Sequence, residues 1–263
     1  MTAPAKTTAA RVSVGWTANN GAGTGVVDPP IVVNDPANSA VDQVFAFTGC
    51  SNVIGTGGAV SQLSANFASG SCVSPTTAGY VAGYCTTVDM GSATGQGDCT
   101  GKNVHSGTFD NQFWVNGTTG GHMLAYGFVS GSTGNSLLSS NPKMYMFPFD
   151  SNHRITGTGS TSFLVNNTRG DECSPLTEFY NGATDRMFFG VGSTTVPNGF
   201  TPDGFIESST LTTTMSTPSC TNPPTSSCVT VPHALGGTSG IIVDNQLSNG
   251  GTNIYSRPSQ LVE

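Results

Sequence analysis

The sequence predicts an all-β protein built from repeated antiparallel hairpins with long polar loops. Three observations support this fold class. The apolar runs are short, rich in Val, Ile and Phe, and separated by turn residues. Gly is abundant, at 35 of 263 residues, and no long stretch combines helical periodicity with capping residues. A hairpin-like segment also recurs along the chain.

Each recurring hairpin consists of an apolar strand, a turn rich in Asn, Gly and Asp, and a second apolar strand. The copy around the Asn181-Gly182 turn is the clearest, and the second copy along the chain is looser than the others. The paired strands are expected at residues 31–33 and 44–47, 107–109 and 122–126, 176–179 and 187–191, and 240–243 and 254–255.

A third strand-like run follows three of these hairpins, at residues 59–63, 143–147 and 204–208. A repeated antiparallel meander is typical of a β-propeller, so we expect a propeller-like ring or partial propeller of about four blades. The alternative is a β-sandwich. A single repeat domain is expected over residues 1–263, with units at about 26–75, 103–160, 171–215 and 236–258. The last unit has only two strands, and the run 11–16 is a candidate to complete it.

Charge is sparse in this chain. Charged residues make up 9%, against roughly 25% in an average soluble domain, and the formal net charge is −7. Because Lys and Arg do not cluster, we expect no nucleic-acid partner. No run approaches the roughly 20 apolar residues that span a bilayer. The first ten residues lack a signal-peptide core, so a secreted form is expected to be the mature chain.

The cysteine pattern favours an extracellular protein with disulfides. Seven cysteines flank loops rich in Gly, Ser, Thr and Pro, and none forms C-x-x-C. Reduced cysteines in a cytosolic protein are the alternative. The sequence does not fix the connectivity; the candidate pairs are Cys50–Cys72, Cys85–Cys99 and Cys220–Cys228, which leave Cys173 over. Asn116 and Asn166 begin N-x-[ST] sequons and are candidate glycosylation sites.

Four segments carry a resemblance to a known family. They are residues 109–111 (FDN), 172–181 (ECSPLTEFYN), 183–189 (ATDRMFF) and 236–245 (GGTSGIIVDN). They resemble uncharacterised secreted bacterial proteins with propeller-like repeats, over most of residues 26–256. The resemblance implies a repeat fold and secretion, and it implies no activity. Members of that family are typically longer, so the chain resembles their C-terminal part.

No catalytic, cofactor-binding or metal-binding residue can be assigned from motifs. G-x-S-x-G, H-E-x-x-H and P-loop patterns are absent from the sequence. The four histidines occupy different positions within the repeats, so we expect no shared metal site. They are His105, His122, His153 and His233.

Carboxylates recur near the hairpins, at Asp42, Asp110, Asp185 and Asp244. They suggest either a carboxylate ring for Ca²⁺ or a sugar, or, as we favour, side chains bonded to their own turn backbone. Glu172 and Glu178 are a candidate acid–base pair for glycoside chemistry, which needs two carboxyl groups roughly 5–9 Å apart. An exposed Trp16 or Trp114 would suit sugar stacking.

These observations favour a non-enzymatic extracellular structural or surface-binding protein, such as a self-assembling or filament subunit. Its partners would be further copies, another extracellular protein or a glycan. Sparse charge leaves little repulsion between copies, and open edge strands invite pairing with another chain. One alternative is a carbohydrate-binding or carbohydrate-active propeller. Another is a quinone-cofactor propeller enzyme, which rests on fold analogy alone.

Overall fold

The computed structural model describes the strand-rich segments of the 263-residue chain. The described residues are 28–35, 42–51, 57–64, 85–90, 104–128, 142–165, 174–191, 205–217, 228–230, 239–244 and 253–256. The protein is all-β, with four antiparallel sheets and one short helix in these segments. Within them, no sheet closes on itself, and no helix is long and apolar enough to cross a membrane.

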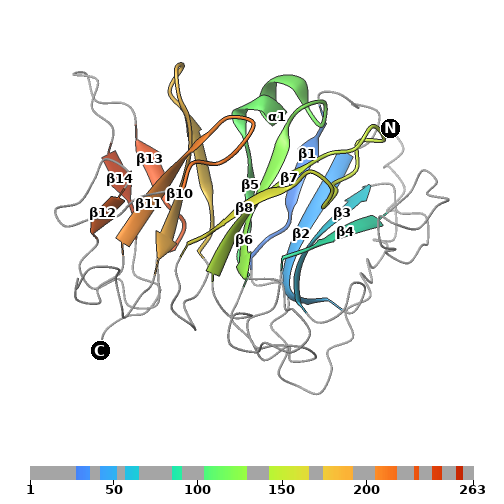
Figure 1. Cartoon of the computed structure of the whole chain (residues 1–263), viewed down its shortest axis with the longest axis horizontal. Coiled ribbons are helices and arrows are strands. Elements are labelled where there is room, and N and C mark those ends of the chain that lie inside the picture. The colour runs from blue at the N-terminus through green and yellow to red at the C-terminus, as the bar shows by residue number, and fades with distance from the viewer. Residues whose placement is uncertain are drawn as a thin grey trace, which may run out of the picture.

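The four sheets follow one another in chain order across the molecule (Figure 1). Within each, strands adjacent in sequence pair with one another. Sheet 1 contains β1 (Ile31–Asn34), β2 (Asp42–Ser51), β3 (Gly57–Ser64) and β4 (Cys85–Asp89). Sheet 2 contains β5 (Thr108–Phe109), β6 (His122–Phe128), β7 (Pro142–Pro148) and β8 (Thr161–Leu164). Sheet 3 contains β9 (Thr177–Tyr180), β10 (Asp185–Val191), β11 (Phe205–Leu211) and β12 (Cys228–Thr230), and sheet 4 contains β13 (Ile242–Asp244) and β14 (Asn253–Tyr255).

The four predicted hairpins and the three predicted third strands are confirmed. The structure adds a fourth strand to each of sheets 1 to 3, namely β4, β8 and β12. It also places a helix, α1 (Asn111–Asn116), in the loop between β5 and β6. The Asp110 carboxylate caps α1 by accepting the Phe113 N–H at 3.0 Å, which satisfies a donor that a helix start leaves free.

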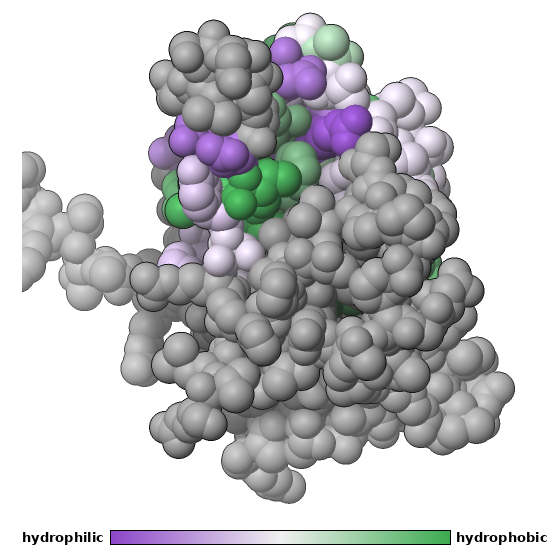
Figure 2. Space-filling view, turned by 90° about the vertical axis from the view of Figure 1, so that its left-hand side faces the viewer, coloured by the Kyte–Doolittle hydropathy of each residue, from purple (hydrophilic) through white to green (hydrophobic). Residues whose placement is uncertain are grey.

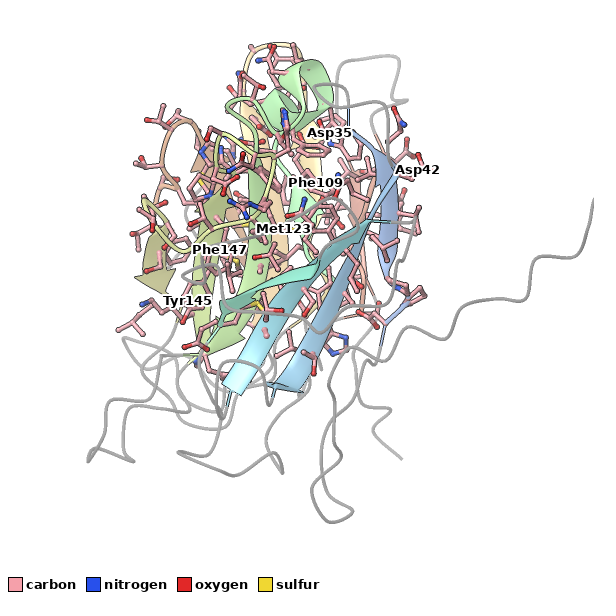
Figure 3. The ribbon with its side chains drawn as sticks, turned by 90° about the vertical axis from the view of Figure 1, so that its right-hand side faces the viewer. Asp35, Asp42, Phe109, Met123, Tyr145 and Phe147 are labelled. Atoms are coloured by element: carbon pink, nitrogen blue, oxygen red, sulfur yellow. The ribbon has the colours of Figure 1, made fainter. Side chains whose placement is uncertain are left out.

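Sheets 1, 2 and 3 share one apolar core. Since each strand alternates its side chains between two faces, a sheet can pack against a neighbour on each side. The Phe45 ring of β2 meets the Phe109 ring of β5 edge-on at 5.1 Å, and Tyr126 of β6 meets Phe189 of β10 at 5.7 Å. Figure 3 views the sheet 1 end of the molecule, with Phe109 of sheet 2 behind the strands of sheet 1. A smaller cluster around Phe188 joins sheets 3 and 4.

The first strands of the sheets are tied to one another in chain order. The Ser106 hydroxyl donates to the Pro29 carbonyl at 3.0 Å, and the Ser106 carbonyl accepts the Leu176 N–H at 3.1 Å. The Thr177 hydroxyl then donates to the Ile241 carbonyl at 2.6 Å. Each contact lies just before or at the start of β1, β5, β9 or β13. Neighbouring sheets are therefore joined where their first strands begin.

Candidate functional site

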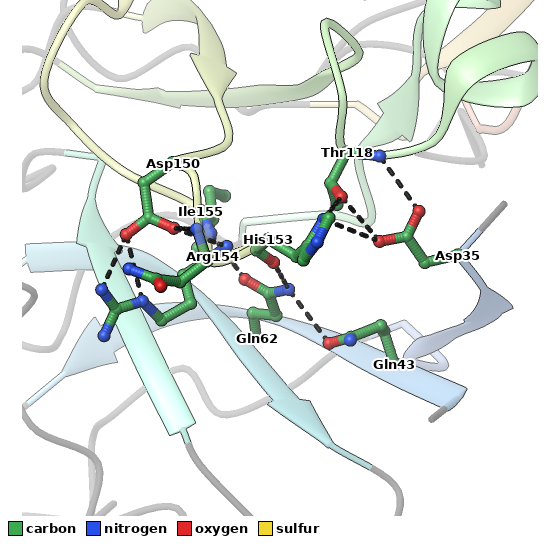
Figure 4. A network of polar contacts seen from close by, with 9 residues as sticks. Asp35, Gln43, Gln62, Thr118, Asp150, His153, Arg154 and Ile155 are labelled. Carbon is green, nitrogen blue, oxygen red and sulfur yellow. Dashed lines mark hydrogen bonds and ion pairs between the residues drawn. The ribbon is translucent and has the colours of Figure 1, made fainter. Parts of the chain in front are cut away.

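Three places in the structure gather polar or exposed side chains of the kind that function requires. The first is a hydrogen-bond network between sheets 1 and 2, shown in Figure 4. The amide of Gln62, on β3, is fully buried. Its nitrogen donates to Gln43 Oε1 at 3.0 Å and to the His153 carbonyl at 2.8 Å, and its oxygen accepts the Ile155 N–H at 2.6 Å. Gln62 therefore fastens the loop after β7 to sheet 1.

Asp35, Thr118 and His153 extend this network. The buried Asp35 carboxylate accepts the Thr118 N–H at 3.0 Å and its hydroxyl at 2.7 Å. The same hydroxyl lies 2.5 Å from Nδ1 of His153. Because the hydroxyl gives its proton to Asp35, His153 donates to it. A nucleophilic triad needs the reverse order, with the imidazole between carboxylate and hydroxyl. This arrangement therefore ties two sheets together and does not activate Thr118.

His153 has a backbone φ of 62°, which is rare for a residue other than glycine. The tight turn before it provides the reason. The His153 N–H donates to the Asp150 carbonyl at 2.9 Å, and the Asp150 carboxylate accepts the N–H groups of Asn152 at 2.8 Å and Arg154 at 3.1 Å. A type I turn followed by one left-handed residue has this pattern. The turn directs the imidazole towards Thr118.

The second place is a group of carboxylates where sheets 2 and 3 meet. Asp110 has both oxygens engaged, because Oδ1 accepts from the Phe113 and His122 N–H groups and Oδ2 lies 2.6 Å from the His122 Nδ1. Asp185, at the start of β10, accepts the Asn111 N–H of α1 at 2.8 Å. This contact crosses the boundary between the two sheets.

Glu178 is the partner of Asp185 in this group. Their hairpin register pairs Met187 with Glu178 and Asp185 with Tyr180, so Glu178 and Asp185 are diagonal neighbours on one face. Burial raises the pKa of Glu178 to about 8, and the hydrogen bond to Asp185 and the charges of Asp185 and Asp110 add to this rise. Burial also raises the pKa of Asp185.

One proton is shared between Glu178 and Asp185 near neutral pH. Glu178 Oε1 and Asp185 Oδ1 are buried and receive no hydrogen bond from a donor in the described segments. Ionised carboxylates only accept, so the two groups can bond to each other only when one is protonated. A protonated and an ionised carboxyl group are also the ingredients of glycoside hydrolysis. Here, however, one oxygen of each group, Glu178 Oε1 and Asp185 Oδ1, is shielded from solvent.

Two exposed aromatic side chains lie on the elements that meet at this carboxylate group. Trp114 on α1 is 49% exposed, and Tyr180 on β9 is 44% exposed. Trp114 stands one helical turn after Asn111, which contacts Asp185, and Tyr180 lies directly opposite Asp185 in the hairpin. The edge of the boundary between sheets 2 and 3 therefore presents aromatic surface beside acidic groups.

The third place is the outward face of sheet 4. Val243 and Ile254 pack towards sheet 3, so their strand neighbours Ile242 and Tyr255, which pair with each other, face away from it. Ile242 is 67% exposed and Tyr255 is 52% exposed. Figure 2 shows hydrophobic surface open at this end of the molecule.

Sheet 3 shows what such a face does. Its corresponding cross-strand pair, Thr177 and Phe188, carries sheet 4: Thr177 bonds to the Ile241 carbonyl, and Phe188 packs against Ile241. In sheet 3 the residues at this position pack against the next sheet, whereas in sheet 4 the corresponding residues, Ile242 and Tyr255, are exposed to solvent.

The structure brings some of the sequence-predicted residues together and separates others. Asp110 and Asp185 converge with Glu178, and Asp110 caps its own turn as expected, whereas Asp185 bonds across the sheet boundary to α1. Asp42 accepts the Asn34 side-chain amide at 3.1 Å, and Asp244 ends β13. Glu172, the expected partner of Glu178, lies outside the described residues.

Each of three histidines lies beside a different aspartate: His105 with Asp28, His122 with Asp110, and His153 with Asp35. In the described segments, no three His, Cys, Asp or Glu side chains are placed to hold a metal ion. His233, Trp16, residues 11–16 and Asn166 lie outside those segments.

The backbone places Cys50, Cys85 and Cys228 in β2, β4 and β12. The side chains of these three cysteines, and all of Cys72, Cys99, Cys173 and Cys220, lie outside the described part, so the candidate disulfides stay predictions. Asn116 is exposed at the end of α1, where its amide donates to Gln112 Oε1 at 3.0 Å.

Comparison with protein-family models, with curated proteins and with solved structures finds no match.

Proposed function

We propose that this protein is a non-enzymatic extracellular structural protein whose copies associate end to end through the outer faces of their terminal sheets. The observation that carries the proposal is the exposed Ile242–Tyr255 pair of sheet 4. A further sheet can pack on this outer face of sheet 4 as sheet 4 packs on sheet 3, because the two faces occupy corresponding positions in their sheets. We further propose that the sheets are blades of a propeller-like repeat, which the ties between their first strands favour.

The composition supports association between copies. Only 9% of the residues are charged, so two such surfaces approach with little electrostatic repulsion. Within the described segments, β14 has a partner only on its β13 side, which leaves backbone donors and acceptors for a neighbouring strand. The cysteine pattern and the resemblance to secreted repeat proteins support an extracellular setting.

The partner surface that we propose is the outer face of sheet 1 on a second copy. Val32 lies on the edge strand β1, on the face that points away from sheet 2, and it is 64% exposed. This is the face that, in each of sheets 2, 3 and 4, packs against the sheet before it in the chain. Contact between the sheet 4 end of one copy and the sheet 1 end of the next is heterologous and extends to a ring or a filament.

Light scattering of charge-substituted variants tests this arrangement. Ile242→Lys and Val32→Lys each place an ammonium group at one end, and both should leave the protein folded and monomeric. Leu164→Lys is the matched control, because Leu164 is an exposed aliphatic residue, at 46%, on strand β8 of an internal sheet. This control should associate as the wild type does.

Mixing the two end variants distinguishes the modes of contact. Each variant keeps one intact end, so a heterologous contact predicts that an equimolar mixture forms dimers and nothing larger. A symmetric contact between two sheet 4 faces predicts instead that Val32→Lys dimerises alone. Association of Ile242→Lys equal to that of the wild type would exclude the sheet 4 face.

A second candidate function is glycan binding at the edge between sheets 2 and 3. Exposed aromatic rings stack on sugars, and carboxylates accept from sugar hydroxyl groups. Tyr180 provides such a ring opposite Asp185, and Trp114 provides another on the helix that Asp185 contacts. If this edge binds glycans, Trp114→Ala should abolish retention on a polysaccharide panel, whereas Ile242→Lys should leave retention unchanged. Absence of retention by the wild type on every polysaccharide would exclude this function.

A further inference from the structure

Glu178 and Asp185 hold a position that makes their charge state matter for the whole molecule. Both belong to the β9–β10 hairpin, which lies between sheet 2 on one side and sheet 4 on the other. Their shared face points towards sheet 2, as does that of the buried Met187 beside them. Asp185 also holds the first backbone N–H of α1. The pair therefore lies in the contact between sheet 2 and sheet 3, which joins sheets 1 and 2 to sheets 3 and 4.

Few charged groups in the described segments face this pair. Asp110 adds negative charge from the sheet 2 side, and the His122 imidazole is bonded to Asp110. Helix α1 and strand β5 contain no titratable side chain. On β10 itself, Arg186 belongs to the opposite face and its guanidinium bonds to Ser208 at 3.4 Å. Across from Asp185, β11 presents the apolar Leu211.

We propose that Glu178 and Asp185 form a pH-sensitive latch between sheets 2 and 3, closed while they share one proton. With the proton present, the two carboxyl groups bond to each other and Asp185 keeps its hold on α1. When the proton leaves, two negative charges and that of Asp110 occupy one half-buried site. Like charges at short range in such a site repel strongly, so the hairpin separates more readily from sheet 2.

The direction of the pH dependence follows from the raised pKa of Glu178. In the unfolded chain this carboxyl has its ordinary pKa of 4.5, and in the folded protein burial raises the pKa to about 8. The folded state therefore binds the proton more tightly. The stabilisation is complete below about pH 4.5, and it is lost as the pH rises through about 8. The latch opens in mildly alkaline solution.

Thermal unfolding between pH 7 and pH 9 tests the latch, in a window above the ordinary histidine pKa. The wild type should lose Tm over this range. Glu178→Gln keeps a side-chain donor for Asp185 and carries no charge, so it should lose most of this dependence and melt above the wild type at pH 9. Asp150→Asn is the control, because Asp150 lies outside the latch, and it should keep the wild-type decline.

Amide hydrogen exchange locates the effect. Exchange of residues 177–191 should accelerate from pH 7 to pH 9 in the wild type, after correction for the intrinsic rate, and should stay constant in Glu178→Gln. An equal Tm decline in wild type and Glu178→Gln would overturn the proposal. If Glu178→Gln does not fold, carboxyl-carbon NMR of the wild type decides the matter: a glutamate titrating near pH 8 supports the latch, and titration of every glutamate near 4.5 refutes it.

Discussion

Replacing Gln62 with Leu should destabilise the protein more than any surface change of the same kind. The substitution removes three hydrogen bonds and leaves the Ile155 N–H, the Gln43 Oε1 and the His153 carbonyl without this partner. An unsatisfied buried polar group costs about 1–3 kcal/mol. Burial of the Leu side chain offsets part of that cost, so we expect a net loss of about 2–4 kcal/mol in the free energy of unfolding.

Thermal and urea unfolding of Gln62→Leu measure this loss. For a domain of this size, the change corresponds to a fall in Tm of roughly 5–15 °C. Gln112→Leu is the matched control, because Gln112 is exposed on α1 and makes one surface hydrogen bond, to Asn116. It should change the unfolding free energy by about 0.5 kcal/mol or less. Equal effects of the two substitutions would refute the role assigned to the network.

Two further substitutions test how the sheets are held. Gly107→Ala should prevent stable folding, because its Cβ would lie 2.1 Å from the Leu124 carbonyl oxygen. Gly240→Ala is the control and should fold normally, because no atom lies within 4 Å of the added Cβ. Circular dichroism measures both outcomes. Asp110→Ala should lower the unfolding free energy by about 2–4 kcal/mol, because it removes the side-chain cap of α1 and leaves the His122 N–H and Nδ1 without the Asp110 carboxylate, while the Phe113 N–H keeps only the carbonyl of residue 110. An unchanged Tm would contradict this.

The hairpins could be predicted from the sequence because their signals are local. The Asn181-Gly182 turn lies between two apolar runs, and both strands form where the pattern places them. Helix α1 has no such signal, since its six residues are fewer than the roughly 11–18 over which helical periodicity is recognised. The strands β4 and β12 are short, and each follows its sheet neighbour at a distance along the chain, so no turn motif pointed to them.

Contacts between sheets have little local signal in the sequence. Asp35 and Thr118 are 83 residues apart, and neither sits in a recognisable motif. The sequence suggests Glu172 as the partner of Glu178, whereas the structure pairs Glu178 with Asp185. That pairing had a sequence signal: once the turn fixes the register of the hairpin, Glu178 and Asp185 become diagonal neighbours on one face.

Sedimentation velocity of the wild-type protein over a wide concentration range tests most directly the proposal that copies associate end to end. The exposed Ile242–Tyr255 pair predicts that the weight-average sedimentation coefficient rises with concentration, and that Ile242→Lys abolishes the rise. Leu164→Lys should follow the wild-type curve. A wild-type protein that sediments as a monomer of 26.8 kDa at every concentration would contradict the proposal.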